Sequence, residues 1–123
     1  MEVMLLPETL TREDGSGGEV TLGPRQGKPL VLTLGITRIA EQQSLDVSIW
    51  GSSDRTYWRQ LTTFPQKYYC GTYLLLLDLT QHREVRHVRA QWRMRRWGAG
   101  ERHAQSGFKL FAETVHVQKT GAA

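Results

Sequence analysis

Apolar residues in this chain recur at every second position or in short runs, and no stretch of helical length carries them at the spacing of an amphipathic helix. The segments 28–34 and 45–50 show the alternation most clearly, with apolar side chains on one face of an extended strand. Successive side chains of a strand point to opposite faces, so each such segment would bury one face against a core. The pattern therefore predicts β-strands as the main elements.

Glycine, proline, serine and aspartate divide the chain into short segments. Residues 35–44 fit either a short helical turn or an irregular strand. Seven or eight short strands separated by turns are typical of a sandwich. The sequence thus predicts an all-β fold, a single antiparallel β-sandwich of the jelly-roll or galactose-binding-like type. We expect its strands in segments 19–22, 28–34, 45–50, 58–64, 68–79, 85–97 and 108–117.

A chain of 123 residues is expected to form one domain, spanning 1–123. Within it, the polar, glycine-rich segment 11–18 predicts a flexible loop, and residues 118–123 predict a frayed tail. The segment 68–79 is the most apolar, which is typical of a central strand buried on both faces. The single cysteine, Cys70, can form no intrachain disulfide, and we expect it to be a small buried apolar residue.

The N-terminal ten residues hold a short apolar patch without a basic stretch, unlike a signal peptide. The longest apolar run, 73–77, is far shorter than the roughly 20 residues of a membrane span. We therefore expect no membrane span, and a protein that is cytoplasmic or part of a larger assembly.

Positive charge is concentrated in one segment. The formal net charge is +4, yet seven arginines and only two acids lie between residues 83 and 102. On a strand, positions 89, 91, 93, 95 and 97 share a face that reads Arg, Gln, Arg, Arg, Trp, while the other face is mainly apolar. Arginine suits bidentate contacts with carboxylate or phosphate groups. The candidate binding residues are Arg89, Arg93, Arg95, Arg96 and Trp97.

This arginine face has two interpretations. It is either a solvated outer face whose arginines pair with nearby acids, or a contact surface for an acidic partner. Nucleic acid is the less favoured partner, because the overall charge is modest and no nucleic-acid motif is present. Trp97 lies beside flexible glycines, where it would stack on a sugar ring, anchor a protein interface or fold back onto the sandwich edge.

Three segments carry a family resemblance. The segment 45–54 (LDVSIWGSSD), followed by Trp58 and Phe64, resembles the hairpin of discoidin-like domains, also called coagulation-factor type C or galactose-binding-like domains. Segments 85–92 (VRHVRAQW) and 108–113 (FKLFAE) are similar to two later strands of that family. Structural proteins of tailed phages and bacterial assembly proteins share the same hairpin pattern.

The resemblance covers roughly residues 45–117 and implies a β-sandwich. Members of the family often bind glycans or lipid head groups through loops at one end. The segment departs from the family pattern in two ways: Arg55 stands where the family has a glycine after the aspartate, and the spacing to Trp58 is longer. We expect Asp54 to form the turn through side-chain bonds to the backbone.

Catalytic chemistry has little support in the sequence. The four histidines are not at metal-ligand spacing, and no nucleophile elbow, phosphate loop or dinucleotide motif is present. We therefore predict no enzyme activity, no cofactor and no metal site. The leading hypothesis is a structural or assembly subunit that docks onto itself or a larger protein complex through the arginine and aromatic strand face. The alternative is a discoidin-type carbohydrate-binding module.

Overall fold

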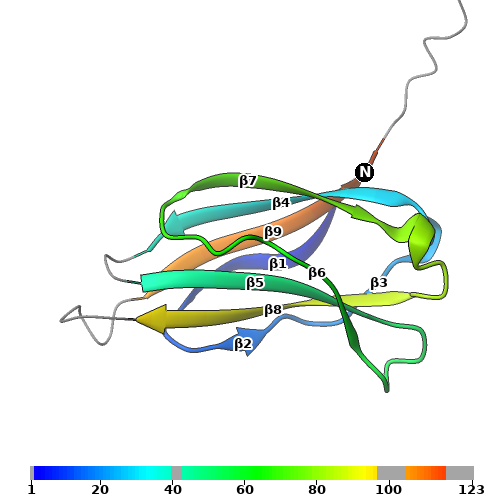
Figure 1. The fold of residues 1–123 in the computed structure, drawn as a ribbon, viewed down its shortest axis with the longest axis horizontal. Helices are drawn as coiled ribbons and strands as arrows, with labels where there is room; N and C mark the ends of the chain where they lie inside the picture. Colours follow the sequence, from blue (N-terminus) through cyan, green and yellow to red (C-terminus); the bar gives the residue numbers. More distant parts are fainter. Residues whose placement is uncertain (1, 40–42, 97–104, 116–123) are drawn as a thin grey trace, which may run out of the picture.

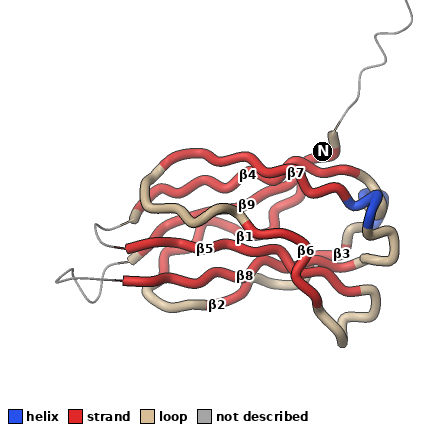
Figure 2. The backbone as a smooth tube through the Cα atoms, viewed as in Figure 1, coloured by secondary structure: helices blue, strands red, loops and turns tan. Residues whose placement is uncertain are grey.

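The computed structural model describes residues 2–39, 43–96 and 105–115. This part of the chain consists of strands and two short 3-10 turns, which lie at one end of the molecule (Figure 2). The strands are β1 (Glu2–Thr11), β2 (Gly15–Ser16), β3 (Val20–Thr21), β4 (Pro29–Arg38), β5 (Gln43–Ser52), β6 (Arg59–Thr63), β7 (Gly71–Asp78), β8 (His87–Arg96) and β9 (Ser106–Thr114). The turns are η1 (Gly23–Arg25) and η2 (Leu79–Gln81).

The strands form two antiparallel sheets. Sheet A has four strands in the order β1-β9-β4-β7. Sheet B has five, in the order β2-β8-β5-β6, with β3 also pairing with β8. The strands of both sheets run along the same long axis of the molecule (Figure 1), as in aligned sandwich packing. This arrangement confirms the all-β sandwich predicted from the alternating pattern.

The core lies between the sheets. The inward side chains that the alternation predicts on β4 and β5 are all buried, as are those of β9. The indole of Trp92 on β8 meets the ring of Phe108 on β9 edge to face, with 5.3 Å between the ring centres. Such aromatic contacts add about 1 kcal/mol to the burial of apolar area. The sandwich is thus held together by alternate residues contributed by both sheets.

The hairpin behind the family resemblance is present. β5 and β6 pair antiparallel, and the carboxylate of Asp54 turns the chain between them by accepting from the backbone N–H groups of Thr56 and Tyr57 at 2.9 and 3.0 Å. Arg55 has a φ of 68°, a left-handed conformation that favours glycine. The Nε of Arg55 donates to the carboxylate of Glu19 at 2.6 Å, in an exposed pair beside the turn.

The segment 68–79 was predicted to be a central strand, and this is wrong. β7 is an edge strand of sheet A, and its outward Leu74 and Leu76 are 68% and 60% exposed. A continuous apolar run is typical of burial on both faces, but here only one face meets the core. Cys70, just before β7, is exposed, which corrects the expectation that it is buried.

Two further segments differ from the prediction. β1 was not expected, because shifts in its pairing with β9 between Met4 and Leu6 and between Leu6 and Thr9 interrupt the alternation. β2 lies inside the segment 11–18 that was predicted to be a loop, and it pairs with β8. The open segment 35–44 continues β4 as a strand as far as Arg38. The tail 118–123 lies outside the described residues.

Candidate partner-binding site

The outer face of sheet B is built around β8 and β5. Their register pairs Asp46 with Arg93, Ser48 with Gln91 and Trp50 with Arg89. These residues point away from the core, because their neighbours in sequence on both strands point inward. The face therefore combines charge, amide, hydroxyl and indole groups in three adjacent rows.

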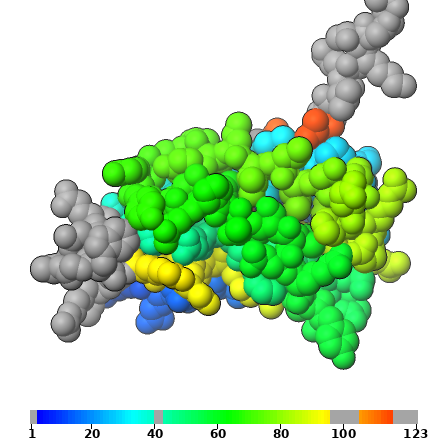
Figure 3. Space-filling view, viewed as in Figure 1, coloured from blue at the N-terminus to red at the C-terminus, as the bar shows by residue number. Residues whose placement is uncertain are grey.

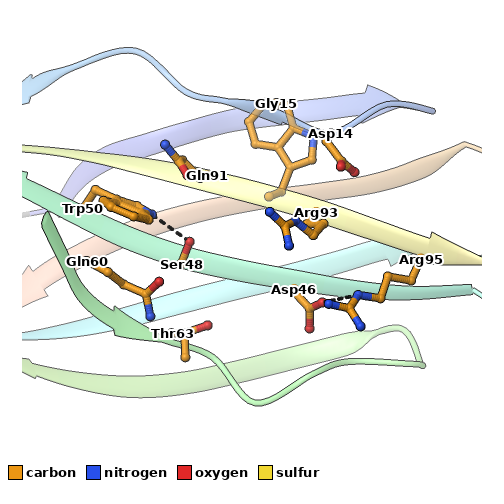
Figure 4. A pocket seen from close by; sticks show the side chains of 11 residues that line it. Asp14, Gly15, Asp46, Ser48, Trp50, Gln60, Thr63, Gln91, Arg93 and Arg95 are labelled. Carbon is orange, nitrogen blue, oxygen red and sulfur yellow. Dashed lines mark hydrogen bonds and ion pairs between the residues drawn. The ribbon is translucent and has the colours of Figure 1, made fainter. Parts of the chain in front are cut away.

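A hollow of about 440 Å³ lies on this face. Its lining comes from the loop before β2 and from strands β2, β5, β6 and β8 (Figure 4). In Figure 3, part of β8, coloured yellow, reaches the surface between blue N-terminal residues and green residues that follow β6. The hollow is lined by Asp14, Gly15, Asp46, Ser48, Trp50, Gln60, Thr63, Gln91, Trp92, Arg93 and Arg95.

One wall of the hollow is the segment that enters β2. The carboxylate of Asp14 accepts from the backbone N–H of Met94 at 2.7 Å, and the indole N–H of Trp92 donates to the carbonyl of Glu13 at 2.8 Å. Only glycine fits at position 15, because a Cβ there would lie 2.6 Å from the indole of Trp92. These contacts hold residues 13–15 against β8, although the two segments lie about 80 residues apart in the sequence.

The opposite wall follows β6. Leu45 and Lys67 exchange backbone hydrogen bonds of 2.8 and 3.0 Å, which extends β5 beyond its pairing with β6. The amide of Gln66 donates to the hydroxyl of Ser44 at 3.0 Å and to the carboxylate of Asp46 at 3.4 Å. Backbone and side-chain bonds thus fix both edges of the hollow before any partner binds.

The two arginines of the hollow differ in their contacts. The Nε of Arg95 lies 3.8 Å from an Asp46 oxygen, in an exposed pair worth about 1 kcal/mol at most. Arg93 is exposed and makes no ion pair with any described residue. Both carboxylates of the hollow already accept hydrogen bonds from the chain. The guanidinium of Arg93 is therefore the group most available to a partner.

Trp50 supplies the aromatic surface of the hollow. Its indole N–H donates to the hydroxyl of Ser48 at 3.0 Å, which fixes the ring on the face of β5 (Figure 4). Gln60 and Thr63 of β6 line the hollow beside it. A half-buried, oriented indole next to neutral polar groups offers both apolar contact and hydrogen bonding.

The predicted residues Arg89, Arg93, Arg95, Arg96 and Trp97 do not all meet in this hollow. Arg93 and Arg95 line it. Arg89 instead lies over the ring of Trp58 at 4.4 Å, and its Nε is buried without a hydrogen-bond partner among the described residues. Arg96 ends β8, but its side chain and the whole of Trp97 lie outside the described part of the structure.

Several residues of the hollow were not predicted. The alternation of segment 45–50 places Trp50 on the same outward face as Asp46 and Ser48, so that signal was present. Asp14 gave no such signal, because it lies 80 positions from Met94 and belongs to a segment expected to be a loop.

Two kinds of site are absent from the described residues. No group of three His, Cys, Asp or Glu side chains in 2–39, 43–96 and 105–115 is placed to hold a metal ion. Within the same residues, no helix has the length and apolar character needed to cross a membrane.

No protein-family model and no curated protein matches this sequence. Among solved structures, the chain is similar to a chain in the structure of infectious bursal disease virus, Gx strain, with a TM-score of 0.54 and 10% identity. The match covers 96% of this chain and 33% of the viral one, so the chain spans about a third of that chain's length. At this identity the likeness shows the fold alone. The fold is a β-sandwich.

Proposed function

We propose that the chain is a non-enzymatic β-sandwich subunit of a larger protein assembly, and that the hollow on sheet B binds an acidic segment of a partner protein. One observation carries this: Arg93 is exposed and without an ion pair among the described residues, in a preformed hollow that also holds Arg95 and Trp50. Arginine and tryptophan are the residue types most enriched where interfaces gain affinity.

The geometry suits an extended segment. Arg93 and Trp50 lie two rows apart along β8, about 13 Å for four residues of strand. A partner segment of about four or five extended residues would place a carboxylate on Arg93 and an apolar side chain on Trp50. The likeness to a chain in a virus structure fits a role in assembly.

Reversing both charges in Arg93→Glu/Arg95→Glu tests the proposal. Proteins retained by the tagged wild-type chain from its source cells would be identified, purified and titrated against the wild type and the variant. Arg86→Glu is the control, because Arg86 is also exposed but does not line the hollow. We expect the double variant to lose the partner and to keep the wild-type unfolding midpoint, while the control binds normally. Equal binding by all three proteins would contradict the proposal.

A discoidin-type carbohydrate-binding module is the second candidate. The observation that favours it is the indole of Trp50 beside the neutral amides of Gln60 and Gln91, a combination suited to the face and hydroxyl groups of a sugar ring. A glycan array would show binding that Trp50→Ala abolishes. An array without binding would remove this candidate and leave the protein partner.

A further inference from the structure

Apolar side chains are exposed on the outer face of sheet A. Register places Met4, Phe111, Thr33 and Leu74 side by side in one row across all four strands, called here the apolar row. Val31 and Leu76 lie in the next row on the same face. Met4, Leu74 and Leu76 are each more than half exposed. Soluble monomers rarely leave a contiguous apolar patch of this kind uncovered.

Two opposite charges lie at equal distances on either side of the apolar row. On β9, Lys109 precedes Phe111 by two residues and Glu113 follows it by two, so all three share the outward face. Both charged side chains are exposed, and neither forms an ion pair with any described residue. The stem of Lys109 lies along β4, since a Cβ on Gly35 would be 3.4 Å from it.

This charge pattern is complementary to itself. A two-fold axis between two facing sheets, perpendicular to the strands and level with the apolar row, lays β9 of one copy antiparallel over β9 of the other. Phe111 then meets its own copy, and Lys109 of each chain faces Glu113 of the second copy. Leu76 faces the smaller Thr72, and Val31 faces the stem of Lys109 that covers Gly35.

We propose that the outer face of sheet A is the interface of a homodimer, packed around the apolar row and fixed in orientation by two Lys109–Glu113 pairs. A second copy is favoured over an unrelated partner because the opposite charges are equidistant from the central aromatic residue. Two sheets pack about 10 Å apart, which side chains of the size of Phe111 and Leu74 fill. The interface lies on the opposite side of the sandwich from the hollow, so it does not depend on partner binding there.

Sedimentation velocity over a range of concentrations tests the dimer. We expect the wild-type chain to shift from monomer to dimer as its concentration rises, and Leu74→Glu to raise the dissociation constant at least tenfold. Arg86→Glu, in the segment before β8 of sheet B and outside the hollow, is the control and should dimerise as the wild type does. Both substituted side chains are exposed, so we expect both variants to fold. Circular dichroism checks this. A wild type that stays monomeric, or an unchanged Leu74→Glu dimer, would overturn the proposal.

Charge reversal tests the orientation. Lys109→Glu and Glu113→Lys should each weaken the dimer about three- to tenfold, because each places like charges opposite one another twice. The chain with both substitutions should regain most of the wild-type affinity. A double variant as weak as the sum of the two single variants would show that these residues do not meet, and the proposed axis would be wrong.

Discussion

The two outer faces of this sandwich differ although their inner faces are alike. The outer face of sheet B carries a hollow lined by arginine, tryptophan, amide and carboxylate side chains. The outer face of sheet A presents a row of apolar side chains with one lysine and one glutamate beside it. Both sheets bury mainly leucine, isoleucine, valine and alanine side chains in one shared core. The alternation therefore builds the fold, while the residues between the buried ones decide what each face can bind.

The strands at the centre of this contrast are β8 and β7. The outward positions of β8 include Gln91, Arg93 and Arg95, and they lie in the middle of a sheet whose neighbours add polar walls. Those of β7 include Leu74 and Leu76, at the edge of a sheet with no such walls. A polar hollow suits a charged segment, whereas an apolar surface suits another surface of the same kind.

The largest expected difference in the free energy of unfolding is between substitutions on the two faces of β9. Phe108 and Phe111 both lie on β9, but Phe108 is fully buried between the sheets while Phe111 faces outward. Phe108→Ala should lower the free energy of unfolding by about 3–5 kcal/mol through lost burial and an internal cavity. Phe111→Ala should cost less, about 1–2 kcal/mol in the monomer, because its side chain is only partly buried and leaves no internal cavity. Urea denaturation at low protein concentration measures both, and equal losses would contradict the assignment of the faces.

The next largest difference in stability is expected between alanine substitutions of two glycines, one in each sheet. A Cβ at Gly15 in sheet B would lie 2.6 Å from the ring of Trp92, which hydrogen bonds and core packing hold in place. Gly15→Ala should therefore destabilise the fold by about 1–3 kcal/mol. Gly35→Ala in sheet A meets only the flexible stem of Lys109 at 3.4 Å. It should change stability by less than about 1 kcal/mol, and thermal unfolding compares the two.

The aromatic part of the hollow gives a smaller, purely functional effect. Trp50→Ala should weaken binding of the purified partner about tenfold, because it removes an oriented aromatic ring from the lining of the hollow. Tyr57→Ala is the matched control, since Tyr57 is 81% exposed and lies outside the hollow. Calorimetric titration measures both affinities. A greater loss with Tyr57→Ala would move the binding surface to the hairpin turn.

The smallest effect concerns pH and the turn of the β5–β6 hairpin. The backbone N–H groups of Tyr57 and Thr56, with the hydroxyl of Ser52, hold the pKa of Asp54 below its ordinary value of 3.8. A carboxylate whose pKa is lower in the folded state stabilises the fold above its unfolded pKa, and this contribution is lost as the pH falls through the folded value. Asp54→Asn should thus be less stable than the wild type at pH 7.

That difference in free energy of unfolding should shrink as the pH falls below 3.8, because the wild-type carboxylate is then protonated as well. Asp78 supplies a second test on sheet A, since the hydroxyl and N–H of Thr80 lower its pKa too. Denaturant titrations between pH 7 and acid conditions measure the free energy of unfolding of Asp54→Asn and Asp78→Asn against the wild type. A gap that stays constant down to low pH would show that charge at Asp54 does not stabilise the turn.

The sequence predicted the fold well where alternation was regular. Segments 28–34 and 45–50 became β4 and β5, with the expected faces inward. β1 was missed because the shifts in its pairing spoil the alternation that reveals other strands. The edge position of β7 was missed because its apolar run fits a central strand equally well, and only the pairing order distinguishes them.

The candidate site was predicted only in part. Arg93 and Arg95 were placed on an outward face by periodicity, and both line the hollow. The stacking of Arg89 on Trp58 depends on the hairpin turn, and the wall formed by Asp14 depends on a contact with β8. Neither contact has a local signature in sequence, because both join segments that only the tertiary fold brings together.

The measurement that tests the central claim most directly is the salt dependence of partner binding. Purified partner would be titrated with the wild-type chain and with Arg93→Glu/Arg95→Glu at several salt concentrations. If the exposed arginines bind an acidic segment, wild-type affinity falls steeply as salt screens the contact, and the variant binds weakly at every concentration. Wild-type affinity that does not change with salt, and is shared by the folded double variant, would contradict the account.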